Sequence, residues 1–155
     1  DLEDDKLRLA AELGATSTIN AAKSNAVAAV LEQTDGQGVD VAMEVVGAAR
    51  PLATAIACVR RRGQICLVGN LSAEVPLPLQ DVVMRELTLV GTCASAGEYP
   101  RAIELIASGA IRVAPLISAV APLAEGPRWF ERLHAREAGL LKVVLRPTSE
   151  GQGIA

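Results

Sequence analysis

The 155-residue sequence predicts a doubly wound α/β fold, in which helices lie on both faces of a parallel sheet. Short apolar runs bounded by glycine alternate along the chain with longer segments whose apolar residues have helical spacing, and this alternation is typical of a parallel sheet. Half of the residues are hydrophobic, but only one Trp, one Tyr and one Phe are present. Small aliphatic side chains must therefore fill the core, which favours helices packed on buried parallel strands.

Five segments are predicted to be helices. The first has acidic residues in its first turn, where the helix dipole favours them, and Gly14 where a C-terminal cap belongs. Pro51 suits the start of the third, because proline lacks the N–H that would be unpaired there. Trp129, Phe130 and Leu133 fall within one turn of the last helix and are expected in the core. The five helices are residues 3–13, 24–33, 51–62, 100–108 and 125–136.

Apolar runs between glycines and turn residues are predicted to be strands. Residues 74–79 are expected to be extended, because Pro76 and Pro78 do not fit a helix. A last polar stretch, residues 148–155, is expected to be a flexible tail. The predicted strands are residues 16–20, 39–46, 64–68, 87–92 and 140–145.

Composition argues against several classes of function. The net charge of −3 does not point to nucleic acid or to an anionic membrane as a partner. No apolar run approaches the roughly 18 residues of a membrane span. Cys58, Cys66 and Cys93 form no CxxC pair and no even set, which favours a reducing, cytoplasmic location. Because His134 is the only histidine, we expect that this chain binds no zinc.

Small residues follow three of the predicted strands. The carboxyl ends of parallel strands meet at one edge of a sheet, where ligands bind, and glycine there lets a flat ligand approach the backbone. Any one of these glycines could simply turn the chain out of its strand. Three such ends at equivalent positions favour a shared binding edge. They are Val45-Val46-Gly47, Val68-Gly69-Asn70 and Gly91-Thr92-Cys93.

Asp1 and the three arginines at residues 60–62 each have two interpretations. In nucleotide-binding βαβ units, an acid about 20 residues after a Gly-rich turn binds the ribose hydroxyls and stands just before a helix, as Asp1 does. The alternative for Asp1 is a helix N-terminal cap. The arginines could bind an anion, but a solvated helix end, favoured by the helix dipole, is the preferred interpretation.

Several short segments share their order and spacing with one known family. They are residues 1–7, 12–15, 38–41, 44–47, 62–69, 115–117, 122–123, 130–133 and 142–145. Together they resemble the medium-chain, zinc-dependent alcohol dehydrogenases, with Gln64 in place of a family glycine, and the resemblance extends to about Pro147. Residues 85–100, with Trp129 and Phe130, are most similar to the sorbitol (iditol) and polyol dehydrogenase branch.

The resemblance implies a set of NAD-binding residues. Asp1 and Lys6 would lie at the adenosine ribose, and Lys142 near the pyrophosphate. Acidic Asp1, followed by Leu2 and no adjacent arginine, favours NAD over NADP. The residues implied to line the cofactor cleft are Val45, Val46, Gly47, Val68, Gly69 and Asn70, and those implied at the nicotinamide end are Thr92, Cys93 and Ala94.

The resemblance also implies how the chain is divided. Residues 1–92 would form a partial Rossmann domain without its first strand, Gly-rich turn and first helix, and residues 93–147 would return to the catalytic domain. The family's zinc ligands and proton relay lie in an N-terminal domain that this sequence does not contain. Because the missing strands are central in the usual strand order, we expect this chain to expose apolar sheet edges and to be stable only with a partner, a rearrangement or domain swapping.

We therefore expect the cofactor-binding C-terminal portion of an NAD-dependent, zinc-dependent dehydrogenase, with no catalytic residue in this chain. The whole enzyme would oxidise a secondary alcohol or polyol by hydride transfer. Two alternatives stay open: a non-catalytic nucleotide-binding or dimerisation module, and a zinc-free oxidoreductase similar to quinone reductases. Residues 74–79 are expected to pair across a two-fold axis in a homo-oligomer, either a dimer or a tetramer.

Overall fold

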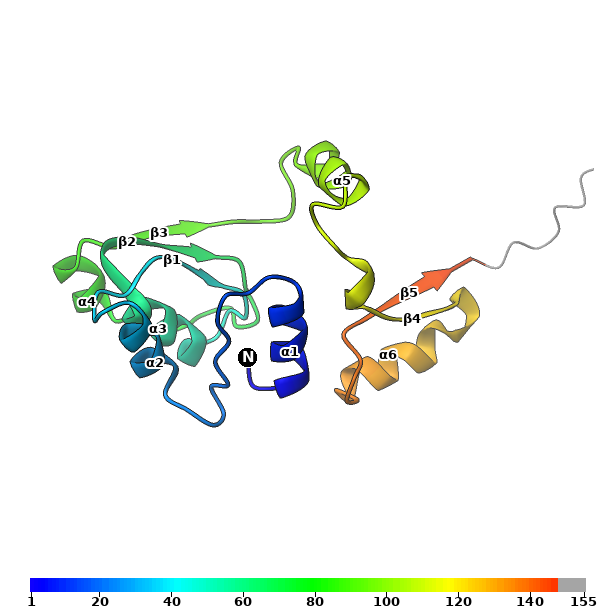
Figure 1. The fold of residues 1–155 in the computed structure, drawn as a ribbon, viewed down its shortest axis with the longest axis horizontal. Helices are drawn as coiled ribbons and strands as arrows, with labels where there is room; N and C mark the ends of the chain where they lie inside the picture. The colour runs from blue at the N-terminus through cyan, green and yellow to red at the C-terminus, as the bar shows by residue number, and fades with distance from the viewer. Residues whose placement is uncertain (148–155) are drawn as a thin grey trace, which may run out of the picture. The chain divides into compact units, whose positions relative to one another are not determined.

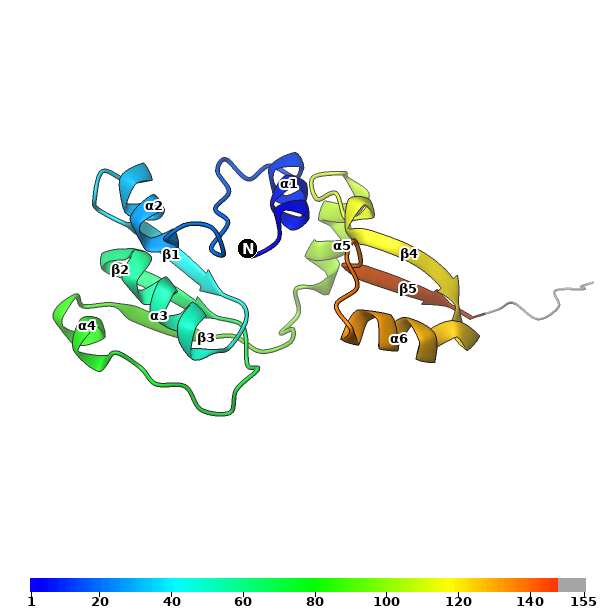
Figure 2. The same cartoon turned by 90° about the horizontal axis from the view of Figure 1, so that it is seen from below.

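The computed structural model describes residues 1–147, in two compact units, of which the first is Asp1–Ala96 and the second begins at Gly97 (Figures 1 and 2). The expected flexible tail, residues 148–155, lies outside the described residues. Each unit contains parallel strands together with helices. The predicted parallel α/β class is therefore confirmed.

Three parallel strands form the sheet of the first unit (Figure 1). Their order is β1 (Val39–Glu44), β2 (Val59–Leu67), β3 (Thr88–Gly91). The connection between β1 and β2 is α3 (Ala49–Cys58), which packs against both strands. The strands therefore have the same order in the sheet as in the sequence, as expected when each parallel strand is added beside the previous one.

Three further helices belong to this unit. The first is α1 (Asp4–Glu12), which ends just before Gly14, whose φ of +112° suits glycine. The second is α2 (Ala26–Gln33), which begins where the Asn25 side chain accepts a hydrogen bond from the Ala28 N–H at 3.1 Å. The third, α4 (Leu79–Met84), was not predicted, because six residues are too few to establish a helical pattern.

The core of the first unit lies on one face of the sheet. Leu52 and Ile56 of α3 pack with Val59 and Ile65 of β2, and α4 adds Val82. In β1, the Met43 side chain is 67% exposed. The expectation that this chain exposes apolar sheet edges and needs a partner for stability stays a prediction.

The arginines at residues 60–62 are part of β2 and not a helix end, so the preferred interpretation of this run is wrong. α3 ends at Cys58, and β2 begins with the next residue. Arg62 has a φ of +61°, at an irregularity where the register between β1 and β2 shifts. Arg60 bonds Asp40 at 2.5 Å, and the other two arginines bond Glu86 at 2.6 Å. These carboxylates, distant in sequence, account for the cluster.

Two sequence expectations fail, one wholly and one in part, at short segments. Residues 16–20 form no strand. Residues 74–79 are not extended throughout, because the Leu79 N–H donates to the Leu77 carbonyl at 2.8 Å in a tight turn over Pro78, and α4 begins at Leu79.

The second unit contains a two-stranded parallel sheet (Figure 2). Its strands are β4 (Ile117–Pro122), which was not predicted, and β5 (Lys142–Arg146). They are joined by α6 (Gly126–His134), whose first residue packs close to Leu145. The unit begins with α5 (Tyr99–Ala107), and short 3-10 turns flank β4 at Ala114–Leu116 and Leu123–Glu125.

The aromatic residues of α6 only partly fill the core. Trp129 is half-buried, donates a hydrogen bond to Glu125 at 3.2 Å and lies 4.2 Å beneath the Arg132 guanidinium. Phe130 is 70% exposed, so its expected place in the core is wrong. No helix within residues 1–147 is long and apolar enough to cross a membrane.

Candidate functional site

The ends of β1, β2 and β3 lie side by side in register. Glu44, Leu67 and Gly91 are the last residues of the three strands, and they pair with one another across the sheet. Because the strands are parallel, the segments that follow leave from one edge. The three small-residue segments therefore share one edge, and that this edge binds a ligand stays a prediction. We call this edge, residues 44–47, 67–72 and 91–94, the strand-end edge.

At this edge the backbones of Gly47 and Gly69 pass in direct contact. A Cβ atom on Gly69 would lie within 3.0 Å of the Gly47 nitrogen, and a Cβ on Gly47 would lie within 3.0 Å of the Asn70 nitrogen. Gly47 also has a φ of +78°, which residues with a side chain rarely adopt. Neither position has room for a side chain, so both glycines are required by the crossing.

Glu44 lies beneath this crossing and is 4% exposed. Its carboxylate accepts hydrogen bonds from the N–H groups of Val46, at 2.9 Å, and Gly47, at 3.0 and 2.9 Å to its two oxygens. Its backbone carbonyl accepts from Val68 at 2.8 Å and Gly69 at 3.0 Å. The sequence analysis did not single out Glu44. The available signal was an acid at the end of an apolar run, directly before the turn residues.

Thr92, directly after β3, forms hydrogen bonds with the end of β2. The carbonyl of Leu67 accepts the Thr92 N–H at 3.0 Å and the Thr92 hydroxyl at 3.3 Å. The next residues, Cys93 and Ala94, are exposed, and Ala94 has a φ of +47°. All three strand ends are therefore connected by hydrogen bonds through Glu44 and Leu67.

The outward surface of the strand-end edge is apolar. Val45, Val46 and Val68 are 64%, 45% and 42% exposed, although each belongs to a buried residue type. The neighbouring backbone donors are already used: Leu71 donates to Val46 at 3.2 Å, and Ser72 donates to Gly47 at 2.9 Å. This surface can pack against a flat, apolar ring system, but it has few free N–H groups to bind a phosphate.

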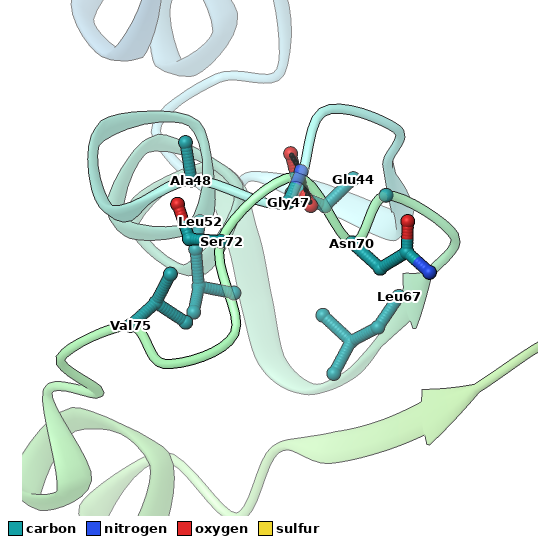
Figure 3. A pocket seen from close by; sticks show the side chains of 9 residues that line it. Glu44, Gly47, Ala48, Leu52, Leu67, Asn70, Ser72 and Val75 are labelled. Carbon is teal, nitrogen blue, oxygen red and sulfur yellow. Dashed lines mark hydrogen bonds between the residues drawn. The ribbon is translucent and has the colours of Figure 1, made fainter.

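A pocket of about 140 Å³ opens beside the glycine crossing (Figure 3). It is smaller than the roughly 300–1,000 Å³ of typical small-molecule sites, so a dinucleotide does not fit inside it. A large ligand at this edge must lie on the exposed surface. The lining residues are Glu44, Gly47, Ala48, Leu52, Leu67, Gly69, Asn70, Ser72 and Val75.

Asp1 lies at the start of the chain, beside residues 19–21. Its ammonium donates to the Ile19 carbonyl at 3.2 Å, and its carbonyl accepts from Ala21 at 3.0 Å. The Asp1 carboxylate accepts the N–H groups of Leu2 at 2.6 Å and Glu3 at 3.0 Å. Asp1 is not the helix N-cap, because that position is Glu3.

The other predicted cofactor residues do not belong to the strand-end edge. Lys6 bonds Glu3 at 2.8 Å, within the α1 segment. Lys142 is exposed at the first position of β5, in the second unit. The cofactor roles of Asp1, Lys6 and Lys142 stay predictions.

The described residues do not form a metal site. Within residues 1–147 no three His, Cys, Asp or Glu side chains gather closely enough to hold a metal ion. Cys58 is buried, and burial raises the pKa of its thiol, which disfavours the thiolate that binds metals. Cys66 is half-buried and Cys93 is exposed.

Comparison with known proteins agrees with this geometry. Residues 1–108 match the zinc-binding dehydrogenase family. The chain is 34% identical to the sorbitol dehydrogenase of Bacillus subtilis over 148 residues, which are 95% of this chain and 42% of that protein. The alcohol dehydrogenase TADH from Thermus sp. ATN1 superposes with a TM-score of 0.81 at 34% identity, over 94% of this chain and 43% of that enzyme.

A structure assigned to the zinc-binding dehydrogenases, from Sinorhizobium meliloti 1021 and bound to NADP, superposes with a TM-score of 0.84 at 28% identity. It is covered over 44% of its length by 95% of this chain. The chain thus spans less than half of the proteins that it matches and corresponds to their C-terminal part. The chain belongs to the zinc-binding, medium-chain dehydrogenase family, on the branch that contains the sorbitol and other polyol dehydrogenases.

Proposed function

We propose that the chain is the cofactor-binding portion of an NAD-dependent, zinc-dependent dehydrogenase that oxidises a secondary alcohol or a polyol. The observation that carries the proposal is the strand-end edge: three parallel strand ends joined by hydrogen bonds, with exposed valines beside a glycine crossing. In parallel α/β folds this is the place where nucleotides bind.

Within this edge, each predicted cofactor residue has a physical role. Val45, Val46 and Val68 would pack against the rings of the dinucleotide, and the crossing of Gly47 and Gly69 lets a ring lie directly on the backbone. Thr92, Cys93 and Ala94, which follow β3, would orient the nicotinamide end. When bound, the nicotinamide accepts the hydride that leaves the alcohol carbon. This chain supplies orientation to that reaction.

The choice of NAD over NADP is proposed from Asp1. A carboxylate can accept two hydrogen bonds from the ribose diol and repels a 2′-phosphate. One structural relative is bound to NADP, so the preference of this chain for NAD is proposed from its own residues and not from that relative. Substitution of Asp1 is therefore the direct test of cofactor choice.

The roles proposed for these residues do not involve zinc. Such enzymes use zinc to polarise the alcohol oxygen. The side chains within residues 1–147 do not fit a zinc site, so the proposal assigns the metal to residues outside this sequence.

The proposal includes a homo-oligomer in the cytoplasm. Three free thiols suit a reducing compartment. Residues 74–78 have no regular secondary structure, and Leu77 and Leu79, at the start of α4, are exposed. Two copies of this segment pairing across a two-fold axis would cover these leucines. Sedimentation velocity should find a dimer or tetramer, and a monomer at every concentration would contradict the pairing.

The activity is tested with the protein at its full natural length, called the full-length protein below. It is incubated with NAD or NADP and with sorbitol, xylitol, 2,3-butanediol or ethanol, and reduced cofactor is followed by absorbance. We expect NAD-dependent oxidation of at least one polyol or secondary alcohol. NAD binding without turnover would favour the non-catalytic module, and NADPH-dependent quinone reduction without alcohol oxidation would favour the zinc-free alternative.

A further inference from the structure

We infer that Glu44 is the positioning residue of the cofactor edge: its side chain and its carbonyl together hold the 45–47 turn and the end of β2 in one arrangement. The inference rests on the proposed function, because it assigns Glu44 the task of presenting that edge to a dinucleotide. Glu44 itself lies beneath the surface and acts through the residues that it holds.

Four backbone N–H groups converge on Glu44. Those of Val46 and Gly47 donate to its carboxylate, and those of Val68 and Gly69 donate to its carbonyl, all at 2.8–3.0 Å. All four donors are residues that the sequence analysis predicted to line the cofactor cleft. One residue therefore fixes both of the segments that flank the glycine crossing (Figure 3).

The burial of the Glu44 carboxylate supports this positioning role. Within residues 1–147, Glu44 is the one charged or polar residue that is buried, and none of the ion pairs described there includes it. Burying a carboxylate without a cation is unfavourable unless hydrogen bonds compensate for the lost water. Both oxygens are compensated, and the compensating groups are the turn amides.

The orientation of the turn follows from these bonds. Because the N–H groups of Val46 and Gly47 point inward to the carboxylate, the Val45 and Val46 side chains are left on the outer surface. Without acceptors at position 44, two buried amides lose their partners, and the turn is driven to rotate them towards water. The valines would then leave the positions from which they pack against the dinucleotide.

A graded series of substitutions in the full-length protein tests this role. Glu44→Gln keeps one oxygen to accept both amides but places an NH2 group against the Gly47 N–H. Glu44→Met keeps a similar length and removes both acceptors. Asp40→Asn, at the opposite end of β1, is the matched control for a lost carboxylate on the same strand. The dissociation constant for NAD and the KM values for NAD and for the alcohol are measured well below the unfolding midpoint.

We expect the NAD dissociation constant to rise about threefold in Glu44→Gln and at least about tenfold in Glu44→Met, with the Asp40→Asn value unchanged. The KM for NAD should rise in parallel, while the KM for the alcohol at saturating NAD stays within about twofold. A purely structural role would instead lower the folded fraction, and hence the apparent kcat, without raising the KM for NAD.

Two outcomes would overturn the inference. One is a folded Glu44→Met protein that binds NAD as tightly as wild type. If Glu44→Met does not fold, the Glu44→Gln variant becomes the test. An unchanged KM for NAD in Glu44→Gln is the second outcome that would overturn the inference. Failure of wild type itself to bind NAD would refute the proposed function instead, so the two failures are distinguishable.

Discussion

Gly47 and Gly69 cross backbone to backbone at the ends of neighbouring parallel strands, and each occupies space that a Cβ on the other would need. The carbonyl of Glu44 bonds the Gly69 N–H, and the carboxylate of Glu44 bonds the Gly47 N–H. The crossing therefore depends on the hydrogen bonds of Glu44 and on the absence of side chains at Gly47 and Gly69. The crossing fixes how the ends of β1 and β2 meet at the strand-end edge.

Substituting Gly69 with alanine should separate the two strand ends. The new methyl group would meet only backbone atoms of Val46 and Gly47, which cannot turn away as a flexible side chain could. We expect a loss of about 3 kcal/mol in the free energy of unfolding, at the upper end for overpacking. Urea unfolding of the full-length protein measures this loss. Gly91→Ala is the control, because a Cβ at Gly91 meets no atom within 4 Å, and equal stability losses in both variants would contradict the crossing.

Arg85 is expected to stabilise the junction between α3 and β2. Its guanidinium donates to the carbonyls of Ile56, at 2.9 Å, and Val59, at the C-terminal end of α3, where carbonyls lack helical partners. Arg85→Ala should cost about 2–3 kcal/mol of unfolding free energy, because two partly buried carbonyls lose a charged donor. The exposed Arg50, at the other end of α3, is the matched control. A urea midpoint for Arg85→Ala equal to that of Arg50→Ala would refute this role.

Acid should weaken the Glu86 cluster. The hydrogen bond from Arg61, and to a smaller extent the one from Arg62, lowers the pKa of the Glu86 carboxyl. Since the unfolded chain then takes up a proton before the folded chain does, stability falls as pH drops from the ordinary glutamate range through the lower folded value. The effect is small because the pair is exposed. Glu86→Gln should flatten the acid side of the urea midpoint plotted against pH, and Glu32→Gln should leave it unchanged. A slope unaltered in Glu86→Gln would show that the ion pairs contribute nothing.

Cofactor preference should respond to the first two residues. In the full-length protein, Asp1→Ser with Leu2→Arg removes the acceptor for the ribose diol and adds a partner for a 2′-phosphate. The ratio of kcat/KM for NAD to kcat/KM for NADP should fall at least about tenfold. Asp5→Ser, which removes an exposed acid in the first turn of α1, is the control. An unchanged ratio in the double variant would remove Asp1 from the cofactor site.

The strand-end edge could be predicted because its signal is local. Glycine directly after an apolar run indicates both the end of a strand and a close backbone approach. Both are found at Gly47 and at Gly69. The family could be predicted because the order of many short segments carries more information than any one of them. Val59, which follows Leu52 and Ile56 at helical spacing, extended the predicted helix past its true end at Cys58.

The features that were missed depend on contacts between distant residues. The arginines of β2 pair with Asp40 and Glu86, and neither carboxylate lies near them in sequence. β4 was hidden because its six residues include Ser118, two alanines and a final proline, which do not form an apolar run. Glu44 resembles an ordinary polar residue at the end of a strand. Only the fold shows that its carboxylate is buried beneath two amides.

The most direct test of the account is hydrogen exchange of the full-length protein with and without saturating NAD, resolved by peptide. Binding at the strand-end edge should slow exchange at least about threefold in peptides covering residues 41–48, 64–72 and 88–95, because a bound ligand suppresses local opening. The peptide covering α5, residues 99–107, should exchange at an unchanged rate. If NAD binds, as measured by calorimetry on the same sample, while all three strand-end peptides exchange as fast as before, the strand-end edge is not the cofactor site.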